Sequence, residues 1–141
     1  MKRKMIVIEG LDGSGKSTQA QLLKNRLKEM GYETFSLDLP YYSDPSSTLV
    51  KMYLGGEMGD KPGDVNAYAA STFYAVDRYA SFKKHWEREY NSDKITVANR
   101  YTTSNASHQM TKLDEKDWDA YLDWLFDFEY NKMGFGKVAK R

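Results

Sequence analysis

The chain has 141 residues, a length that suits one domain (residues 1–141) with a buried core. Its 21 basic and 20 acidic residues leave a net charge of +1, which excludes an overall field that would attract nucleic acid or an anionic membrane. The lack of cysteine excludes disulfides and thiolate metal sites, and no apolar run is long enough for a signal peptide or a bilayer span. These features favour a cytoplasmic protein.

A glycine-rich stretch over residues 10–18 fits the phosphate-loop pattern G-x-x-x-x-G-K-[ST]. An apolar run predicts a buried strand over about residues 4–9, and apolar residues at helical spacing predict a helix over about residues 15–30. In such a loop the backbone N–H groups surround an anion, and the helix N-terminus adds a favourable dipole. The residues expected to hold phosphate are Gly10, Gly13, Ser14, Gly15, Lys16, Ser17 and Thr18.

Two side chains of this loop carry specific chemistry. Lys16 can reach the β- and γ-phosphates of a nucleotide, and the Ser17 hydroxyl can bind Mg²⁺. The alternative is a glycine-rich turn before an ordinary helix. Because every fixed position and both flanking elements are present, the sequence predicts a site for a nucleoside polyphosphate.

The next part of the chain predicts a strand, a loop and a short helix. Residues 33–38 are typical of a second strand, parallel to the first, and the prolines of residues 39–45 indicate a loop. Ser46 or Ser47 is a suitable N-cap for a short helix that ends near Leu54.

Two longer helices are predicted over about residues 64–91 and 114–132, each beginning at an aspartate with N-cap chemistry. Between them, residues 94–98 predict a third strand and residues 103–110 a short helix.

The first of these long helices has two distinct faces. Phe73, Val76 and Ala80 form one apolar stripe. Tyr74 and Arg78 are four residues apart and therefore share a different face.

The alternation of strands and helices predicts a doubly wound parallel α/β fold. In such sheets, ligands lie beyond the carboxyl ends of the strands. Residues 10–18, 39–45 and 99–105 each follow a predicted strand, so we expect them to converge on one cleft.

Segments with characteristic sequences occur in order along the chain: EGLDGSGKST (9–18), PYY (40–42), YAVDR (74–78), NRYTTSN (99–105) and FEYNKMG (128–134). On these motifs the chain resembles the thymidylate kinase family, and the match extends over essentially all 141 residues. The resemblance implies a P-loop kinase fold and the reaction ATP + dTMP → ADP + dTDP in dTTP biosynthesis, with Mg²⁺ bound together with ATP. It also implies a homodimer that binds neither nucleic acid nor membrane.

The resemblance also assigns roles to residues. The expected dTMP-binding residues are Asp12, Tyr42, Tyr74, Arg78, Arg100, Ser104, Asn105 and His108. The expected catalytic residues are Lys16, Asp12 and Arg100, and the expected metal site uses Ser17 directly and Asn99 indirectly.

By this resemblance, Tyr74 stacks on thymine, Arg78 contacts the nucleobase and phosphate, Arg100 holds the acceptor phosphate, and Asn105 reads the pyrimidine edge. These side chains have the required stacking, charge and amide chemistry. No general base is expected, since the acceptor phosphate is already ionised near pH 7.

Several of these assignments have plainer alternatives. Asp12 is also suited to an Asx turn, Tyr74 to the core, and Arg100 to a surface salt bridge. For His108, a partly exposed helix position is the favoured interpretation.

The chain departs from the family pattern in several places. Asn99 stands where the family has an acidic residue, and an amide brings no charge to Mg²⁺. Residues 40–42 and Gly13 lack arginines that family members place there, and His108 replaces a common tyrosine. The sequence stops before the family's fourth strand, lid and last strands, so we expect an N-terminal portion of a family member, with its first strand at an unpaired edge.

Other functional classes stay open at this point. One is a related kinase for another deoxynucleotide or a deoxynucleoside. Another is a non-catalytic nucleotide-binding remnant, favoured by Asn99 and the missing lid. A third is an assembly module that uses the aromatic face of residues 114–132 or the long helix over about residues 64–91.

Overall fold

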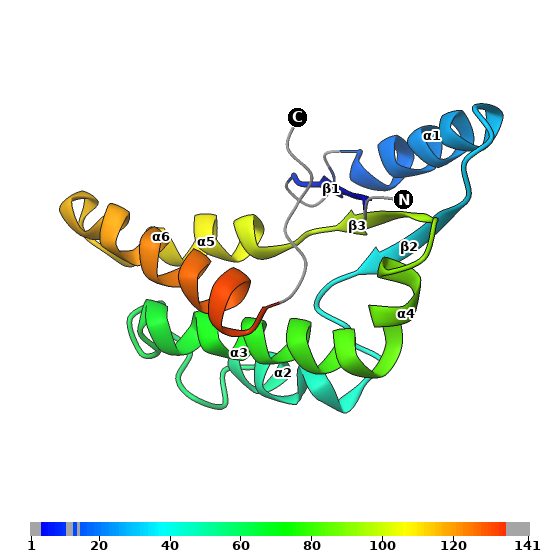
Figure 1. Ribbon diagram of the computed structural model, residues 1–141. Helices are drawn as coiled ribbons and strands as arrows, with labels where there is room; N and C mark the ends of the chain where they lie inside the picture. The colour runs from blue at the N-terminus through cyan, green and yellow to red at the C-terminus, as the bar shows by residue number, and fades with distance from the viewer. Residues whose placement is uncertain (1–3, 11–12, 14, 135–141) are drawn as a thin grey trace.

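The computed structural model describes residues 4–10, 13 and 15–134 as a parallel sheet with helices on both faces (Figure 1). The strands are β1 (Lys4–Ile8), β2 (Thr34–Asp38) and β3 (Ile95–Asn99). The helices are α1 (Lys16–Glu29), α2 (Thr48–Leu54), α3 (Ala67–Ser81), α4 (Glu87–Tyr90), α5 (Thr102–Met110) and α6 (Trp118–Phe126). The described chain also contains two 3₁₀ segments, η1 (Pro45–Ser47) and η3 (Glu115–Asp117), and two π-helical segments, η2 (Phe82–Trp86) and η4 (Asp127–Lys132).

The strand order is β1-β3-β2, and β3 is parallel to both neighbours. The predicted doubly wound parallel fold is therefore confirmed, and each predicted strand is displaced by at most one residue at an end. Within the described residues, β1 pairs with β3 alone, as expected for an edge strand.

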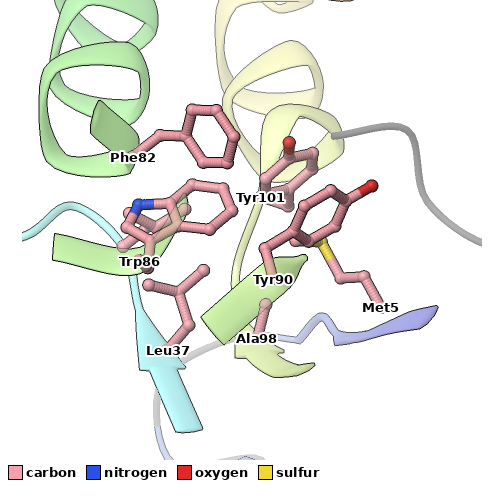
Figure 2. Close-up of a cluster of buried hydrophobic side chains, with 8 residues drawn as sticks. Met5, Leu37, Phe82, Trp86, Tyr90, Ala98 and Tyr101 are labelled. Atoms are coloured by element: carbon pink, nitrogen blue, oxygen red, sulfur yellow. The ribbon is translucent and has the colours of Figure 1, made fainter. Parts of the chain in front are cut away.

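Successive side chains of the strands point to opposite faces of the sheet and so build two apolar layers. On one face, Leu27 of α1 packs against Ile95 and Val97 of β3. On the other face, η2 and α4 cover Leu37 and Ala98 (Figure 2).

The layer under η2 and α4 is mainly aromatic. Figure 2 shows Phe82, Trp86 and Tyr90 beside the sheet, with Tyr101 from the segment after β3. Trp86 is completely buried, and the ring centroids of Phe82 and Trp86 are 4.7 Å apart in an edge-to-face arrangement. Large aromatic rings thus pack against this side of the sheet together with aliphatic side chains.

The buried face of α3 differs from the predicted stripe. Phe73, Val76 and Ala80 are only half-buried. The fully buried positions of α3 are small or polar: Ala67, Ala70, Ser71, Ala75, Asp77, Arg78 and Ser81. The large apolar side chains that cover the sheet follow α3, in η2 and α4.

The helix caps also differ from those predicted. The Asp44 carboxylate accepts a hydrogen bond of 2.7 Å from the Ser46 backbone N–H at the start of η1, whereas Ser47 stands at the predicted N-cap position of α2 but makes no side-chain cap hydrogen bond. Asn66 caps α3 by accepting from a backbone N–H, whereas Asp64 closes the preceding turn. Both errors arise in short polar stretches where several side chains have cap chemistry.

The two long predicted helices are confirmed as runs of helical segments. The first run comprises α3, η2 and α4, and the second comprises η3, α6 and η4. Tyr121 and Leu125 of α6 are buried against Ala67 of α3 and Ala106 of α5 in a smaller apolar core. This core places α5 and α6 beside α3 (Figure 1).

Among the described residues, no helix combines the length and apolar character that crossing a bilayer would require.

Candidate nucleotide-binding site

A cavity of about 1200 Å³ opens at the carboxyl edge of the sheet, where Ile8 and Asp38 flank Asn99 in register. Its walls come from the phosphate loop, the loop after β2, helices α2, α3 and α5, and the end of β3. The predicted site residues that line it are Gly13, Gly15, Lys16, Ser17, Thr18, Tyr42, Tyr74, Arg78, Asn99, Arg100, Ser104, Asn105 and His108. The three segments expected to converge thus meet at one cavity.

The phosphate side of the cavity is formed by the glycine loop and the N-terminus of α1. Gly13 and Gly15 have φ values of 79° and 91°, which favour glycine, and Gly15 precedes the first helical residue, Lys16. The start of α1 carries no acidic residue in its first turn, so its dipole is free to attract an anion. Of the predicted residues, Gly10 does not line the cavity, and Asp12 and Ser14 lie outside the described part of the chain.

The end of β3 adopts an unusual backbone conformation. Arg100 has a φ of 68°, the left-handed region that a non-glycine residue rarely occupies, and its N–H donates to the Ile8 carbonyl at 3.1 Å. The next N–H, of Tyr101, donates to the Glu9 carboxylate at 3.2 Å. These bonds from the β1 end hold Arg100 at the cavity wall.

The opposite wall is built by α3 and α5. Tyr74 and Arg78 both line the cavity, as their shared helix face predicts, and burial raises the pKa of Tyr74 to about 12. Asn105 is 4% exposed, and both polar atoms of its amide are buried without a hydrogen-bond partner among the described residues. A buried amide with an unused donor and acceptor has the capacity to bind a polar ligand.

Arg78 has an internal partner that sequence analysis did not anticipate. Its Nε donates to the Glu129 carboxylate at 3.0 Å, and its Nη2 forms an ion pair with the other carboxylate oxygen. Burial alone would lower the pKa of Arg78, but the Glu129 charge outweighs this effect and the pKa is raised. The anion expected to face Arg78 is thus partly supplied by the chain itself. The available signal was an acidic residue between Phe128 and Tyr130 in a helical run.

Sequence analysis also missed residues on the α5 side of the cavity. Gln109 follows Asn105 by one helical turn, lines the cavity and is 2% exposed, and its Oε1 has no hydrogen-bond partner in the described chain. The Lys112 ammonium donates to the Tyr53 hydroxyl at 2.8 Å and to the Val65 carbonyl at 2.9 Å. The spacing of four from Asn105 was a usable signal for Gln109, whereas the contacts of Lys112 depend on tertiary structure.

The loop after β2 is fastened to α3 and η2 by two carboxylates. Asp77 accepts hydrogen bonds from the Tyr41 N–H at 2.9 Å and from the Ser46 hydroxyl at 2.7 Å. Asp44 accepts from Lys84 at 2.6 Å and from His85 at 2.7 Å. Because Tyr42 lies in this anchored loop, its position at the cavity depends on both carboxylates.

The described residues contain no cluster of three or more acidic, histidine or cysteine side chains that could enclose a metal ion. Ser17 and Asn99 both line the cavity, and Asn99 Oδ1 is buried without a hydrogen-bond partner among the described residues. A hydroxyl and an uncharged amide oxygen fit Mg²⁺ that keeps several water ligands and binds mainly through nucleotide phosphates.

A parallel sheet whose first strand leads through a glycine loop into a helix, with a cavity at that point, defines a P-loop nucleotide-binding α/β protein of the kinase type. A family model described as thymidylate kinase matches residues 8–128. The chain therefore belongs to the thymidylate kinase family.

Individual relatives agree with this membership. The thymidylate kinase of Mycobacterium tuberculosis (strain H37Rv) is 29% identical over 136 residues, which are 94% of this chain and 61% of the relative. A probable thymidylate kinase of Thermococcus onnurineus is 33% identical over 125 residues, covering 86% of this chain and 58% of the relative. The chain thus spans about three fifths of the length of these curated relatives.

Solved structures show the same fold. The thymidylate kinase of Candida albicans superposes with a TM-score of 0.60 at 25% identity, covering 88% of this chain and 56% of the other. That of Ehrlichia chaffeensis gives a TM-score of 0.62 at 24% identity, with 89% and 67% covered. The expected P-loop kinase fold is therefore confirmed.

Proposed function

We propose that this chain carries the ATP-phosphate site and the dTMP site of a thymidylate kinase, which transfers the γ-phosphoryl group of ATP to dTMP and produces ADP and dTDP. One observation supports this most: a single cavity is lined both by Lys16 of the phosphate loop and by Tyr74, Arg100 and Asn105. A phosphoryl donor and an acceptor with a planar base could thus be held against each other in one cavity.

In this proposal each wall of the cavity has its own task. Lys16 and the α1 N-terminus bind the ATP phosphates, and Arg100 binds the phosphate of the acceptor. Tyr74 stacks on the base and Asn105 hydrogen-bonds to its polar edge. Catalysis then consists of positioning and charge neutralisation, because the acceptor phosphate is already an ionised nucleophile.

The remaining assigned roles are also part of the proposal. Asp12 would lie near the acceptor sugar, and Ser104, His108 and Tyr42 would complete the dTMP site. Ser17, with Asn99 through a water ligand, would hold Mg²⁺, which when bound with ATP offsets the negative charge of its phosphates.

The test is a phosphoryl-transfer assay with Mg-ATP and dTMP, with dUMP, dCMP, dGMP and the thymine ribonucleotide as competing acceptors. We expect dTDP to form with a preference for dTMP, and Lys16→Ala to abolish it. Preference for another acceptor would instead support the related-kinase alternative.

A second candidate is a nucleotide-binding protein without turnover, which the uncharged Asn99 at the metal position favours. Calorimetry separates the two functions: saturable binding of dTMP without product supports the second candidate. No binding of any nucleotide would contradict both functions and favour the assembly-module alternative.

We also propose the homodimer and the cytoplasmic location that family membership suggests, with no nucleic-acid partner. Sedimentation of the purified chain at several concentrations would test the dimer.

A further inference from the structure

The Arg78 guanidinium is bound along one edge by a carboxylate. Its Nε and Nη2 both bond to Glu129, from a segment 51 residues further along the chain. No described residue bonds to the remaining nitrogen, Nη1, although Arg78 lines the cavity. A guanidinium held by two of its nitrogens is fixed in its plane, so the direction of its third nitrogen is fixed as well.

Glu129 is itself held rigidly. It is 0% exposed, and its Oε2 accepts a hydrogen bond from the Thr102 hydroxyl at the start of α5 as well as from Arg78. Tyr101, which is 1% exposed, helps to exclude water from the pair. The carboxylate is thus anchored on α5 and, through the backbone of η4, on the second helical run.

A buried ion pair of this kind is not an efficient way to stabilise a core, because two apolar side chains of similar volume often do as well or better. Arg78 also borders a cavity, where an apolar residue would suffice if only packing mattered. The pair is better explained by the direction that it gives to the free guanidinium nitrogen.

We propose that Glu129 is a positioning residue that holds Arg78 by its Nε–Nη2 edge and presents Nη1 to an oxygen atom of the acceptor nucleotide. Thr102 is the second support, since its hydroxyl fixes the carboxylate. The nature of the ligand rests on the proposed function, whereas the fixed orientation of the arginine does not.

The first test measures dTMP affinity by calorimetry in a double-mutant cycle of Arg78→Met, Glu129→Gln and their combination. Glu129→Gln keeps the shape and one acceptor oxygen but removes the charge. We expect each single variant to weaken dTMP binding about tenfold or more and the combination to equal Arg78→Met alone, because Glu129 acts through Arg78. Independent, multiplying losses would overturn the proposal.

A matched control is Glu89→Gln, which makes the same substitution in a surface ion pair with Lys94. It should leave dTMP affinity unchanged. If Glu129→Gln does not fold, Thr102→Val takes its place, since it keeps the ion pair but frees the carboxylate to turn. A partial loss of dTMP affinity in this variant supports the proposal, and unchanged affinity contradicts it.

The second test needs no ligand: ¹⁵N relaxation of the Arg78 Nε–Hε group. A rigid signal in the unmodified protein that becomes mobile in Glu129→Gln or Thr102→Val supports the proposal. A mobile signal in the unmodified protein overturns it. Absence of dTMP binding by the unmodified protein would remove the proposed function, and relaxation would still decide whether Glu129 fixes the arginine.

Discussion

Residues at the cavity edge adopt backbone conformations that most side chains disfavour. Gly15, directly before α1, is a clear case because its φ of 91° is unfavourable for any side chain, while a Cβ atom there would meet nothing within 4 Å. The cost of a substitution is therefore conformational and not steric. Arg100 has a similarly unfavourable backbone conformation, with a φ of 68°. Its backbone hydrogen bond to Ile8 of β1 offsets the conformational free energy.

We predict that Gly15→Ala lowers the free energy of unfolding by about 1–2 kcal/mol, the cost of a left-handed alanine. Chemical denaturation would measure it. Gly63→Ala is the matched control, because Gly63 has no positive φ and equally open surroundings. Equal effects of the two variants would contradict the conformational explanation.

Asp44 predicts a dependence of stability on pH. Hydrogen bonds from Lys84 and then His85 hold the pKa of Asp44 below its ordinary value. Because the folded-state pKa is lowered, the contribution of Asp44 is fully present above its unfolded pKa of about 3.9 and is lost as the pH falls below it. The pH dependence that Asp77 adds has the opposite sign. Burial raises the pKa of Asp77, so its contribution to the free energy of unfolding is lost as the pH rises through its folded-state pKa.

We expect the free energy of unfolding of Asp44→Asn to fall less between about pH 5 and pH 3 than that of the unmodified protein. Urea midpoints across this range would show it. Lys84→Met, which removes the largest cause of the shift, should flatten the same part of the curve. Variants that run parallel to the unmodified protein would contradict this role of Asp44.

At the scale of elements, the periodicity of the sequence predicted where the strands and helices lie. The strands and the glycine loop were located because apolar runs and the spacing of residues 10–18 are local signals. The buried face of α3 could not be predicted, since Asp77 and Arg78 are buried only because groups from distant segments form hydrogen bonds with them. Similarly, the helix cap at Asp44 depended on a choice among nearby polar residues.

Lys112, which follows α5, donates from one ammonium group to Tyr53 of α2 and to the carbonyl of Val65 before α3. We predict that Lys112→Met lowers the free energy of unfolding by about 1–3 kcal/mol, because charge-assisted bonds are lost while the aliphatic stem is retained. Thermal and chemical unfolding would measure this. The exposed Lys116→Met is the control, with an effect within about 0.5 kcal/mol.

At the scale of the whole molecule, α3 and α5 contribute walls to the cavity and also meet α6 in the smaller apolar core. The cavity walls on α3 and α5 therefore depend on the smaller core for their spacing. Loss of packing in the smaller core should therefore disturb the site even when no residue that lines the cavity is changed.

Leu125 is 0% exposed in that smaller core, whereas Leu22 on α1 is 56% exposed. The same substitution can thus be compared at a buried and an exposed position. We expect Leu125→Ala to lower the free energy of unfolding by about 2–5 kcal/mol and Leu22→Ala by no more than about 0.5 kcal/mol. Denaturant midpoints of both variants would test this, and similar losses would contradict the assignment of Leu125 to a core.

The pairing of Arg78 with Glu129 also has a consequence for the newly made chain. The arginine leaves the ribosome 51 residues before its carboxylate partner. At ~5–20 residues per second, the interval is about 3–10 s. During that time the α3 cation has no Glu129 to neutralise it, so the acceptor wall of the cavity can take its final form only after the second helical run has been translated.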